Sequence, residues 1–279
     1  MKPPPFVYHR PRSLSEAFDC LRTLDGDVKL LAGGQSLVPM LNFRLARPDH
    51  LVDLNDLTEL DYVRVGEATI EIGALARHHR LATDPQIRAA LPLLAHGAAS
   101  IGHYAIRRRG TLGGSLSHAD PSADWVASLA AIGARVLIRG PAGQRSLAIE
   151  DFVTGAFEVA LDPGEILEAV RIPRLSRSAR WGFYKICRKT GELAQAIGAV
   201  LHDPERSVFR AVIGAMESRP IVLSDAASLF GGKPRAGLPA AFDPGAAARV
   251  LSAAGMTDPF DNQIHVVALK RAIDQADLA

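Results

Sequence analysis

The feature that most constrains this chain is residues 107–125, R-R-R-G-T-L-G-G-S-L-S-H-A-D-P-S-A-D-W, with the pair Gly113-Gly114 at their centre. Adjacent glycines lack the Cβ atoms that restrict the backbone, so the chain can turn tightly and present successive N–H groups to an anion. Asp120 and Pro121 then have the character of a helix N-cap and a first helical residue. We therefore expect a helix over 121–131 whose positive end favours a phosphate at this loop.

A second Gly-Gly pair lies earlier in the chain. A short strand over 28–31 runs into A-G-G-Q-S-L at 32–37, and a helix is expected from there to about residue 45. Neither pair has the G-x-G-x-x-G spacing of a Rossmann fingerprint, and no P-loop lysine follows. A single Gly-Gly turn is more often structural than ligand-binding. Two of them, each followed by hydroxyl residues and a helix start, favour a ligand with two phosphates enclosed by two loops.

Several residues near the second loop allow two interpretations. Asp120 is an N-cap and Asp124 a solvated acid of the first helical turn, or one of them binds ribose hydroxyls or other ligand donors. Arg107–Arg109 form either a solvated face or a phosphate clamp. The nine histidines show no metal-binding spacing, and His78, His79 and His118 are interpreted as surface or hydrogen-bonding residues. Because Ser115 is not in a G-x-S-x-G elbow, a hydrolase triad is not expected.

The net charge and the cysteine count limit which ligands and partners this chain can be expected to bind. A net charge of +2 gives no support for nucleic-acid binding. Only Cys20 and Cys187 are present, too few for an iron–sulfur cluster or a disulfide framework, and they are interpreted as buried reduced thiols. No apolar run reaches membrane length, and the first residues lack a signal-peptide core. We expect a cytoplasmic protein without a membrane span.

The remaining pattern predicts an α+β protein. A capping-box sequence starts a helix over 13–23, and alternation predicts a hairpin of 62–65 with 69–72. Other expected elements of the first part are helices over 75–82 and 85–100, strands over 135–138 and 166–172, and a short helix or irregular piece over 149–157. A polar segment at 173–178 marks a domain boundary. Beyond it we expect three antiparallel strands (183–187, 194–201, 208–216), helices (223–230, 240–253, 265–276) and a loop over 231–244.

Three motifs together identify a family resemblance. They are A-G-G-Q-S-L-V-P at 32–39, R-G-T-L-G-G-S at 109–115 and H-A-D-P at 118–121. They resemble the FAD-binding medium subunit of molybdenum hydroxylases, relatives of carbon monoxide dehydrogenase, quinoline oxidoreductase and xanthine dehydrogenase. The resemblance implies a vanillyl-alcohol-oxidase-type FAD domain over 1–173, with subdomains of about 1–55 and 56–173. It also implies a C-terminal α+β domain over 177–279, with a three-stranded antiparallel sheet and helices.

The resemblance further implies that this chain binds FAD, which we expect to be noncovalent. The two glycine loops would wrap the pyrophosphate, the 118–124 segment would hold the rest of the cofactor, and Lys185 with the 191–194 turn would approach the isoalloxazine. No catalytic residue and no metal ligand are expected. The cofactor-binding residues implied are Ala32, Gly33, Gly34, Gln35, Ser36, Leu37, Thr111, Gly114, Ser115, His118, Asp120, Asp124, Lys185, Glu192 and Leu193.

The chain departs from the family pattern at two places. It has Gly-Glu-Leu-Ala at 191–194 where relatives commonly have Gly-Asp-Phe/Tyr-Ala, and Arg-Arg-Arg-Gly at 107–110 where they often have Arg-Asn-Arg-Gly. The second departure concerns a contact near the second loop. The first concerns the cover of the flavin ring: Leu193 is either a core residue of the next strand or a smaller cover that leaves the flavin more open.

The function implied by the resemblance is electron transfer. Hydroxylation would take place on a molybdenum-cofactor large subunit, and electrons would arrive singly from an iron–sulfur small subunit and leave to an external acceptor. A dimer of heterotrimers is expected. One alternative is a self-contained FAD oxidoreductase, against which the lack of a convergent His, Tyr and acid set near the loops argues. Another is a flavin-free scaffold subunit, against which the intact loops argue.

Overall fold

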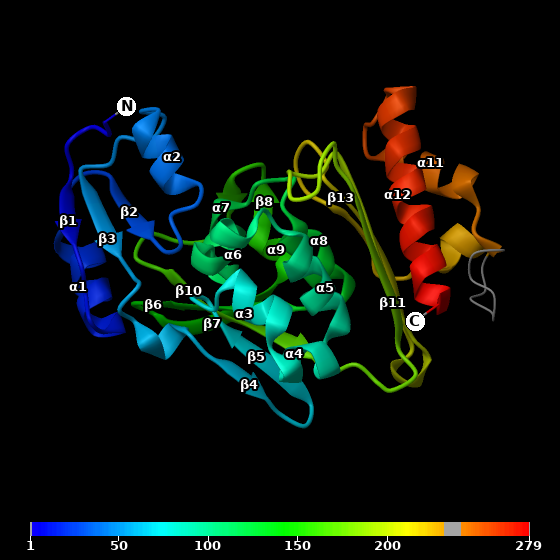
Figure 1. Cartoon of the computed structure of the whole chain (residues 1–279), viewed down its shortest axis with the longest axis horizontal. Helices are drawn as coiled ribbons and strands as arrows, with labels where there is room; N and C mark the ends of the chain where they lie inside the picture. The colour runs from blue at the N-terminus through cyan, green and yellow to red at the C-terminus, as the bar shows by residue number, and fades with distance from the viewer. Residues whose placement is uncertain (1, 232–240, 279) are drawn as a thin grey trace.

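The computed structural model describes residues 2–231 and 241–278. Along the long axis, a small sheet with α1 and α2 lies at one end. A larger sheet with most of the helices occupies the middle, and a third sheet covered by α12 lies at the other end (Figure 1). The chain runs through these three parts in sequence order.

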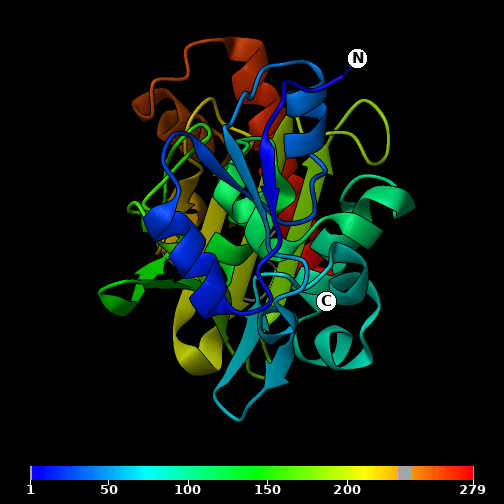
Figure 2. The same cartoon turned by 90° about the vertical axis from the view of Figure 1, so that its left-hand side faces the viewer.

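The first part is a three-stranded parallel sheet in the order β1-β3-β2. As predicted, Ser13 caps α1, because its side chain accepts a hydrogen bond from the Glu16 N–H. Figure 2 shows this unit from its outer side, with the rest of the molecule behind it. Its elements are β1 (Val7–His9), α1 (Leu14–Thr23), β2 (Val28–Leu31), α2 (Leu37–Asn42) and β3 (His50–Asp53).

The middle part is a five-stranded antiparallel sheet in the order β4-β5-β10-β6-β7. The predicted hairpin is confirmed as its first two strands. The strands are β4 (Val63–Val65), β5 (Thr69–Gly73), β6 (Arg135–Gly140), β7 (Gly143–Ala148) and β10 (Ile166–Pro173), with the separate pair β8 (Val153–Gly155) and β9 (Glu158–Val159).

Helices pack on one side of this sheet around a large apolar core, and α8 is buried along its whole length. The helices are α3 (His78–Thr83), α4 (Pro85–Ala90), α5 (Pro92–Ser100), α6 (Tyr104–Arg109), α7 (Leu112–His118), α8 (Asp124–Ala131) and α9 (Ile149–Phe152), with a 3-10 turn η1 (Thr58–Leu60).

Four predictions for this part need correction, the first being that the helix expected over 75–82 begins only at His78. The helix expected over 85–100 is two helices, because Leu91 has a non-helical backbone before Pro92. The helix expected from Pro121 begins only at Asp124. The pair Gly113-Gly114, expected in a loop, lies inside α7.

The last part is a four-stranded antiparallel sheet in the order β11-β12-β13-β14. The expected three strands are present as β11 (Arg180–Ile186), β12 (Ala196–Asp203) and β13 (Val208–Gly214). A fourth, β14 (Ile221–Leu223), was missed because three residues are too few to show alternation. The helix expected over 223–230 is instead the 3-10 helix η3 (Ala226–Phe230). Most of the loop expected over 231–244 lies outside the described residues.

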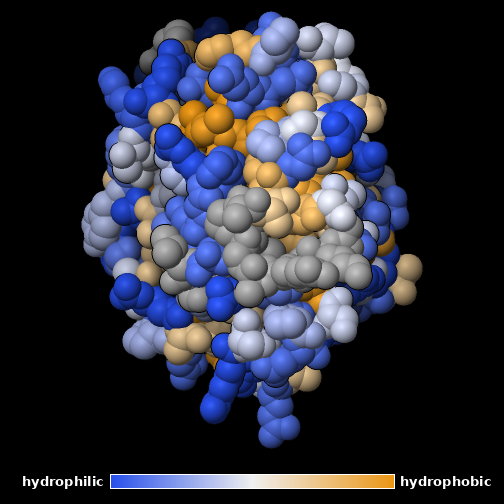
Figure 3. All heavy atoms as spheres, turned by 90° about the vertical axis from the view of Figure 1, so that its right-hand side faces the viewer, coloured by the Kyte–Doolittle hydropathy of each residue, from blue (hydrophilic) through white to orange (hydrophobic). Residues whose placement is uncertain are grey.

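The long helix α12 (Pro259–Leu278) crosses this sheet, and α11 (Pro244–Ala253) packs beside it. Two strand glycines permit a close approach. A Cβ on Gly198 would lie 2.5 Å from the Ala268 carbonyl oxygen, and one on Gly182 would overlap the Ala272 carbonyl oxygen. The outer face of this part is mostly hydrophilic, with a smaller hydrophobic patch (Figure 3). Within the described ranges, no helix is both long and apolar enough to cross a membrane.

Candidate functional site

The first glycine loop connects β2 to α2. Gly34 has φ +71°, a backbone conformation that other residues rarely adopt. A Cβ on Gly33 would overlap the Arg109 carbonyl oxygen and lie 2.7 Å from the Cα of Gly110. Among the described residues, the backbone N–H groups of residues 33–36 have no acceptor, and Gln35 and Ser36 are exposed. The N–H groups of this loop are therefore unoccupied among the described residues, as the predicted anion loop requires.

The second loop differs from the prediction. Thr111 is the N-cap of α7, and its Oγ1 accepts a hydrogen bond from the Gly114 N–H at 3.1 Å. The Gly113 N–H donates to the Ala74 carbonyl at 2.8 Å, and that of Ser115 donates to the Thr111 carbonyl at 3.1 Å. The expectation that this glycine pair offers free N–H groups was wrong. The half-buried hydroxyl of Ser115 has no partner in the part of the chain that the structure describes.

The second glycine pair serves close packing instead. A Cβ on Gly113 would lie 2.5 Å from that of Ala74. One on Gly114 would lie 2.7 Å from Thr111 Oγ1 and 3.2 Å from the Cβ of Ala32 in the first loop. The two loops, separated by some 75 residues of sequence, therefore touch at glycines and form one cradle.

A chain of polar side chains that the sequence did not reveal links the two loops. The Asn55 side chain donates to the Ala32 carbonyl at 2.8 Å and accepts from Arg77 at 2.6 Å. Arg77 also donates to the Arg109 carbonyl. At the far end, Tyr8 and Asn55 donate to Asp53. Although burial opposes this, their hydrogen bonds lower the pKa of Asp53 below its ordinary value.

His78 packs against the second loop at Gly110. Its ring is buried, and its Nδ1 accepts a hydrogen bond from the Trp125 indole at 3.1 Å. Burial, with smaller contributions from nearby arginines, lowers the pKa of His78 to about 3, so the ring is neutral. A Cβ on Gly110 would lie 2.7 Å from this ring. The prediction of a hydrogen-bonding histidine is confirmed, but it is not at the surface.

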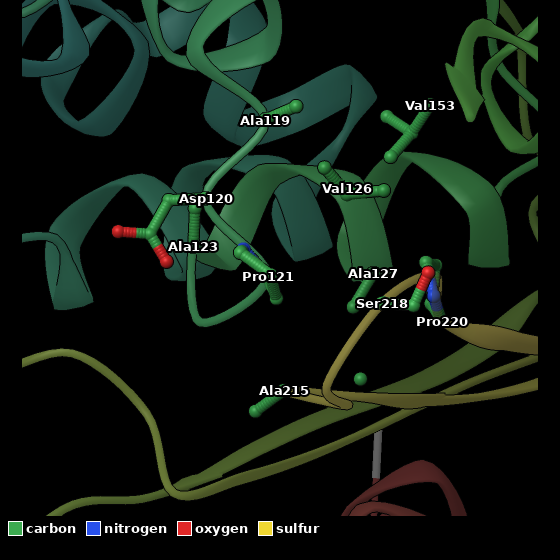
Figure 4. Close-up of a pocket in the computed structure, with 11 residues that line it drawn as sticks. Ala119, Asp120, Pro121, Ala123, Val126, Ala127, Val153, Ala215, Ser218 and Pro220 are labelled. Atoms are coloured by element: carbon green, nitrogen blue, oxygen red, sulfur yellow. The ribbon is translucent and has the colours of Figure 1, made fainter. Parts of the chain in front are cut away.

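The segment after α7 makes a turn. Asp120 accepts from the Ser122 N–H at 2.9 Å and so caps this turn, whereas Ala123 stands at the N-cap position of α8. The His118 ring is half-buried, 5.1 Å from that of Phe157. A shallow pocket lies beside the turn, and the Asp120 carboxylate points away from its Ser218 and Pro220 wall (Figure 4).

Asp124 and Lys185 form a buried ion pair at 3.0 Å, with side chains 4% and 7% exposed. The hydroxyl of Ser100 donates to the other carboxylate oxygen of Asp124 at 2.9 Å. Burial raises the pKa of Asp124, while Lys185 and Ser100 oppose that rise. The interpretation of Asp124 as a solvated acid was therefore wrong.

The turn before β12 lies against the same region. Gly191 has φ +90°, and a Cβ there would lie 2.7 Å from the Gly102 carbonyl oxygen. The Ala194 N–H donates to the Ser122 carbonyl at 3.3 Å. Leu193 is 58% exposed, so its interpretation as a strand core residue was wrong. The Glu192 carboxylate lies 4.0 Å from Arg188.

The three arginines of α6 have separate environments. Arg107 donates to the carbonyls of Ile101 and Gly102, both at 2.9 Å. Arg108 and Arg109 are exposed. Arg107 is therefore half-buried and bonded to the main chain rather than part of a solvated face.

The candidate residues thus form two groups, at the two ends of α7. The glycine loops lie at its start. The Asp120–Asp124 turn, with Lys185 and Leu193 linked to it, follows its end. Seven residues of α-helix span about 10 Å at 1.5 Å per residue. This elongated arrangement suits a ligand with a diphosphate at one end and a second recognition group at the other.

Comparisons with known proteins show the family of this chain. Residues 4–175 match the family described as "FAD binding domain in molybdopterin dehydrogenase". The carbon monoxide dehydrogenase medium chain of Hydrogenophaga pseudoflava is 39% identical over 201 residues, 72% of this chain and 70% of that relative. The caffeine dehydrogenase subunit beta of Pseudomonas sp. (strain CBB1) is 41% identical over 206 residues, 74% and 70% of the two chains.

Solved structures give the same result over nearly the whole chain. Quinoline 2-oxidoreductase from Pseudomonas putida 86 superposes with a TM-score of 0.85 at 32% identity, covering 100% of this chain and 99% of that chain. Carbon monoxide dehydrogenase from Hydrogenophaga pseudoflava gives 0.84 at 31% identity, with 99% and 98% covered.

Proposed function

Because this chain belongs to the family of FAD-binding domains in molybdopterin dehydrogenases, we propose that it is the electron-transfer subunit of a multi-subunit molybdenum hydroxylase. It carries FAD and passes electrons from iron–sulfur clusters on a partner subunit to an external acceptor. When bound, FAD supplies a redox centre that can take up electrons singly and release them to that acceptor. The residues of this chain bind and orient the cofactor.

The observation that carries the proposal is the contact between the two glycine loops. The N–H groups of residues 33–36 in the first loop have no acceptor among the described residues, and Gly33 and Gly114 let the two backbones approach closely. A diphosphate needs such a set of donors and close backbone approach. The residues present therefore fit FAD.

We assign the cofactor-binding residues in two groups. Residues 32–37, with Thr111, Gly114 and Ser115, hold the pyrophosphate. His118, Asp120, Asp124, Lys185, Glu192 and Leu193 hold or adjoin the rest of the cofactor. Because Lys185 is paired with Asp124, its role is to fix Asp124 and the adjoining turn rather than to act as a free cation.

The proposed domain division follows the three sheets. The FAD domain is residues 1–173, of the vanillyl-alcohol-oxidase type, with subdomains of about 1–55 and 56–173. The C-terminal domain is residues 177–279. The apolar cluster between α12 and its sheet supports the boundary of the C-terminal domain, although the α8 cluster also includes residues of β11 to β13. The cluster around α1 crosses the proposed subdomain boundary, because it includes Leu57, Leu60, Leu75 and Ile166.

The proposed partners are an iron–sulfur small subunit and a molybdenum-cofactor large subunit, in a dimer of heterotrimers. A cytoplasmic location is part of the proposal, and the two free cysteines favour it.

The direct test is FAD binding by the purified chain. A yellow protein that releases about one free FAD per chain on acid precipitation supports the proposal. A colourless protein that takes up no FAD on titration contradicts it, since the first loop would then have no ligand of the assigned kind.

A further inference from the structure

We propose that Asn55 and Arg77 are positioning residues that set the separation of the two glycine loops for the cofactor's diphosphate. This inference rests on the proposed function, since it assumes that the diphosphate binds where the loops meet. It adds to the proposed site two residues that lie outside both glycine loops.

The amide of Asn55 holds the first loop. Its Nδ2 donates to the Ala32 carbonyl at 2.8 Å and to Asp53, while its Oδ1 accepts from Arg77 at 2.6 Å. Only one orientation of the amide gives donors to both oxygens and an acceptor to the guanidinium. The Asn55 N–H also donates to Asp53 at 2.9 Å, and Tyr8 donates to the second oxygen of that carboxylate. The amide is therefore fixed from two sides.

The guanidinium of Arg77 holds the second loop. It donates to the carbonyl of Arg109, the residue directly before Gly110 and Thr111. The backbone of Arg77 also forms an antiparallel bridge with Thr111, the N-cap of α7. Arg77 is thus attached to this loop through both its main chain and its side chain.

The Arg109 carbonyl takes part both in the hydrogen-bond link and in the contact between the glycine loops. It accepts from Arg77, and it is also the atom that a Cβ on Gly33 would overlap. Contact between glycine backbones is non-directional, so it limits how near the loops come but does not keep them together. The directional link runs from Ala32 through Asn55 and Arg77 to Arg109, and it joins segments far apart in the chain.

The charge of Arg77 suits this place. The Arg77 guanidinium donates to two neutral groups, the side-chain amide of Asn55 and the main-chain carbonyl of Arg109. Burial lowers the pKa of Arg77. Five donors are available on a guanidinium, and these bonds do not use them all. A positive charge between the loops favours a diphosphate there more than a neutral side chain would.

The test compares FAD affinities of full-chain variants, measured by flavin fluorescence quenching. Asn55→Ala and Arg77→Met should each weaken FAD binding about tenfold, the scale of one or two lost hydrogen bonds. The double variant should be little weaker than the poorer single variant, because either change breaks the same link. Arg77→Lys, which keeps the charge but not the forked donors, should recover part of the affinity.

The matched control is Tyr62→Phe, which removes a half-buried side-chain hydrogen bond to Glu71 at 2.7 Å in the same domain. It should lower thermal stability without changing FAD affinity. If Asn55→Ala fails to fold, Asn55→Ser replaces it, since a serine hydroxyl cannot reach both Ala32 and Arg77.

Two failures are distinguishable. A parent protein that does not bind FAD overturns the proposed function. A parent that binds FAD, with Asn55 and Arg77 variants binding as tightly as Tyr62→Phe, overturns the present inference alone. Strictly additive losses in the double variant would also overturn it, because they would mean that the two residues act separately.

Discussion

The Lys185 ammonium and the Asp124 carboxylate, 3.0 Å apart and almost fully buried, join β11 to α8. The two residues lie on opposite sides of the proposed domain boundary. Each charge is compensated mainly by the other, because Ser100 supplies the only other side-chain hydrogen bond to the pair within the described residues. Removing either residue would therefore leave a buried, uncompensated charge at the junction of the two proposed domains.

We expect Lys185→Met to destabilise the protein by about 3–5 kcal/mol at neutral pH, because it leaves the Asp124 carboxylate buried and uncompensated. Burial raises the pKa of Asp124 in the folded state, so protonated Asp124 stabilises the fold at low pH. This contribution is lost as the pH rises through the folded-state pKa. The variant's deficit should therefore shrink on acidification. Urea unfolding at several pH values measures it. A deficit that stays constant down to pH 4 contradicts the argument.

Gly114→Ala should lower FAD content, and Gly114→Val should abolish it. The added Cβ would lie 2.7 Å from Thr111 Oγ1, so this N-cap must shift, and 3.2 Å from the Ala32 Cβ, so the first loop must move slightly away. Gly97→Ala is the matched control, because it adds a Cβ in another helix with its nearest neighbour at an ordinary 3.8 Å. Flavin absorbance per protein gives the result. Equal FAD content in the two alanine variants would refute the packing argument.

His78→Gln should make stability less dependent on pH. The native pKa of about 3 lies below the ordinary value of 6.5, so the unfolded chain binds the proton more tightly and stability falls as pH drops through this range. Between pH 7 and pH 5 the parent should lose about 2 kcal/mol from this residue. Glutamine does not titrate, and its carbonyl can accept from Trp125. Identical pH profiles for parent and variant would exclude a buried neutral His78.

Leu193→Tyr should slow the reaction of the reduced flavin with oxygen. Leu193 is exposed and lies in the 191–194 turn, whose Ala194 N–H donates to the Ser122 carbonyl. An aromatic ring at this position can therefore cover part of the proposed flavin site. FAD content should not change, because the glycine loops are untouched. Stopped-flow reoxidation at equal FAD occupancy decides the matter. Equal rates would mean that Leu193 does not border the flavin.

The isolated chain should show at most flavin reduction by artificial donors. It has too few cysteines for iron–sulfur clusters, and hydroxylation is assigned to a partner. Affinity purification from the native source should therefore recover a cluster-bearing subunit and a molybdenum subunit. Hydroxylation of a heterocycle or an aldehyde by the isolated chain would refute the assignment.

Local signals in the sequence predicted local structure well. The Ser13 cap, the hairpin of β4 and β5 and the strand–glycine–helix of the first loop all depend on residues close together in the chain. The motifs also predicted the family correctly, since the first loop and the 109–115 segment are both within its matched range.

What the sequence could not predict depends on partners far along the chain. The second glycine pair has its N–H groups occupied partly because Ala74, some 40 residues earlier, accepts one of them. Asp124 is buried in α8 and paired there with Lys185, which lies 61 residues later in β11. Asn55 and Arg77 carry no motif, and only their shared contacts between the loops identify them.

The unequal state of the two loops has a consequence for how binding proceeds. The second loop already has its N–H groups satisfied by Thr111 and Ala74, so it needs little rearrangement to receive a ligand. The N–H groups of the first loop have no acceptor in the described part of the chain, so this loop is the part that we expect a ligand to order. The conformational entropy lost on binding should therefore be concentrated in residues 33–36, and amide exchange there should slow more than in residues 111–115 when FAD is added.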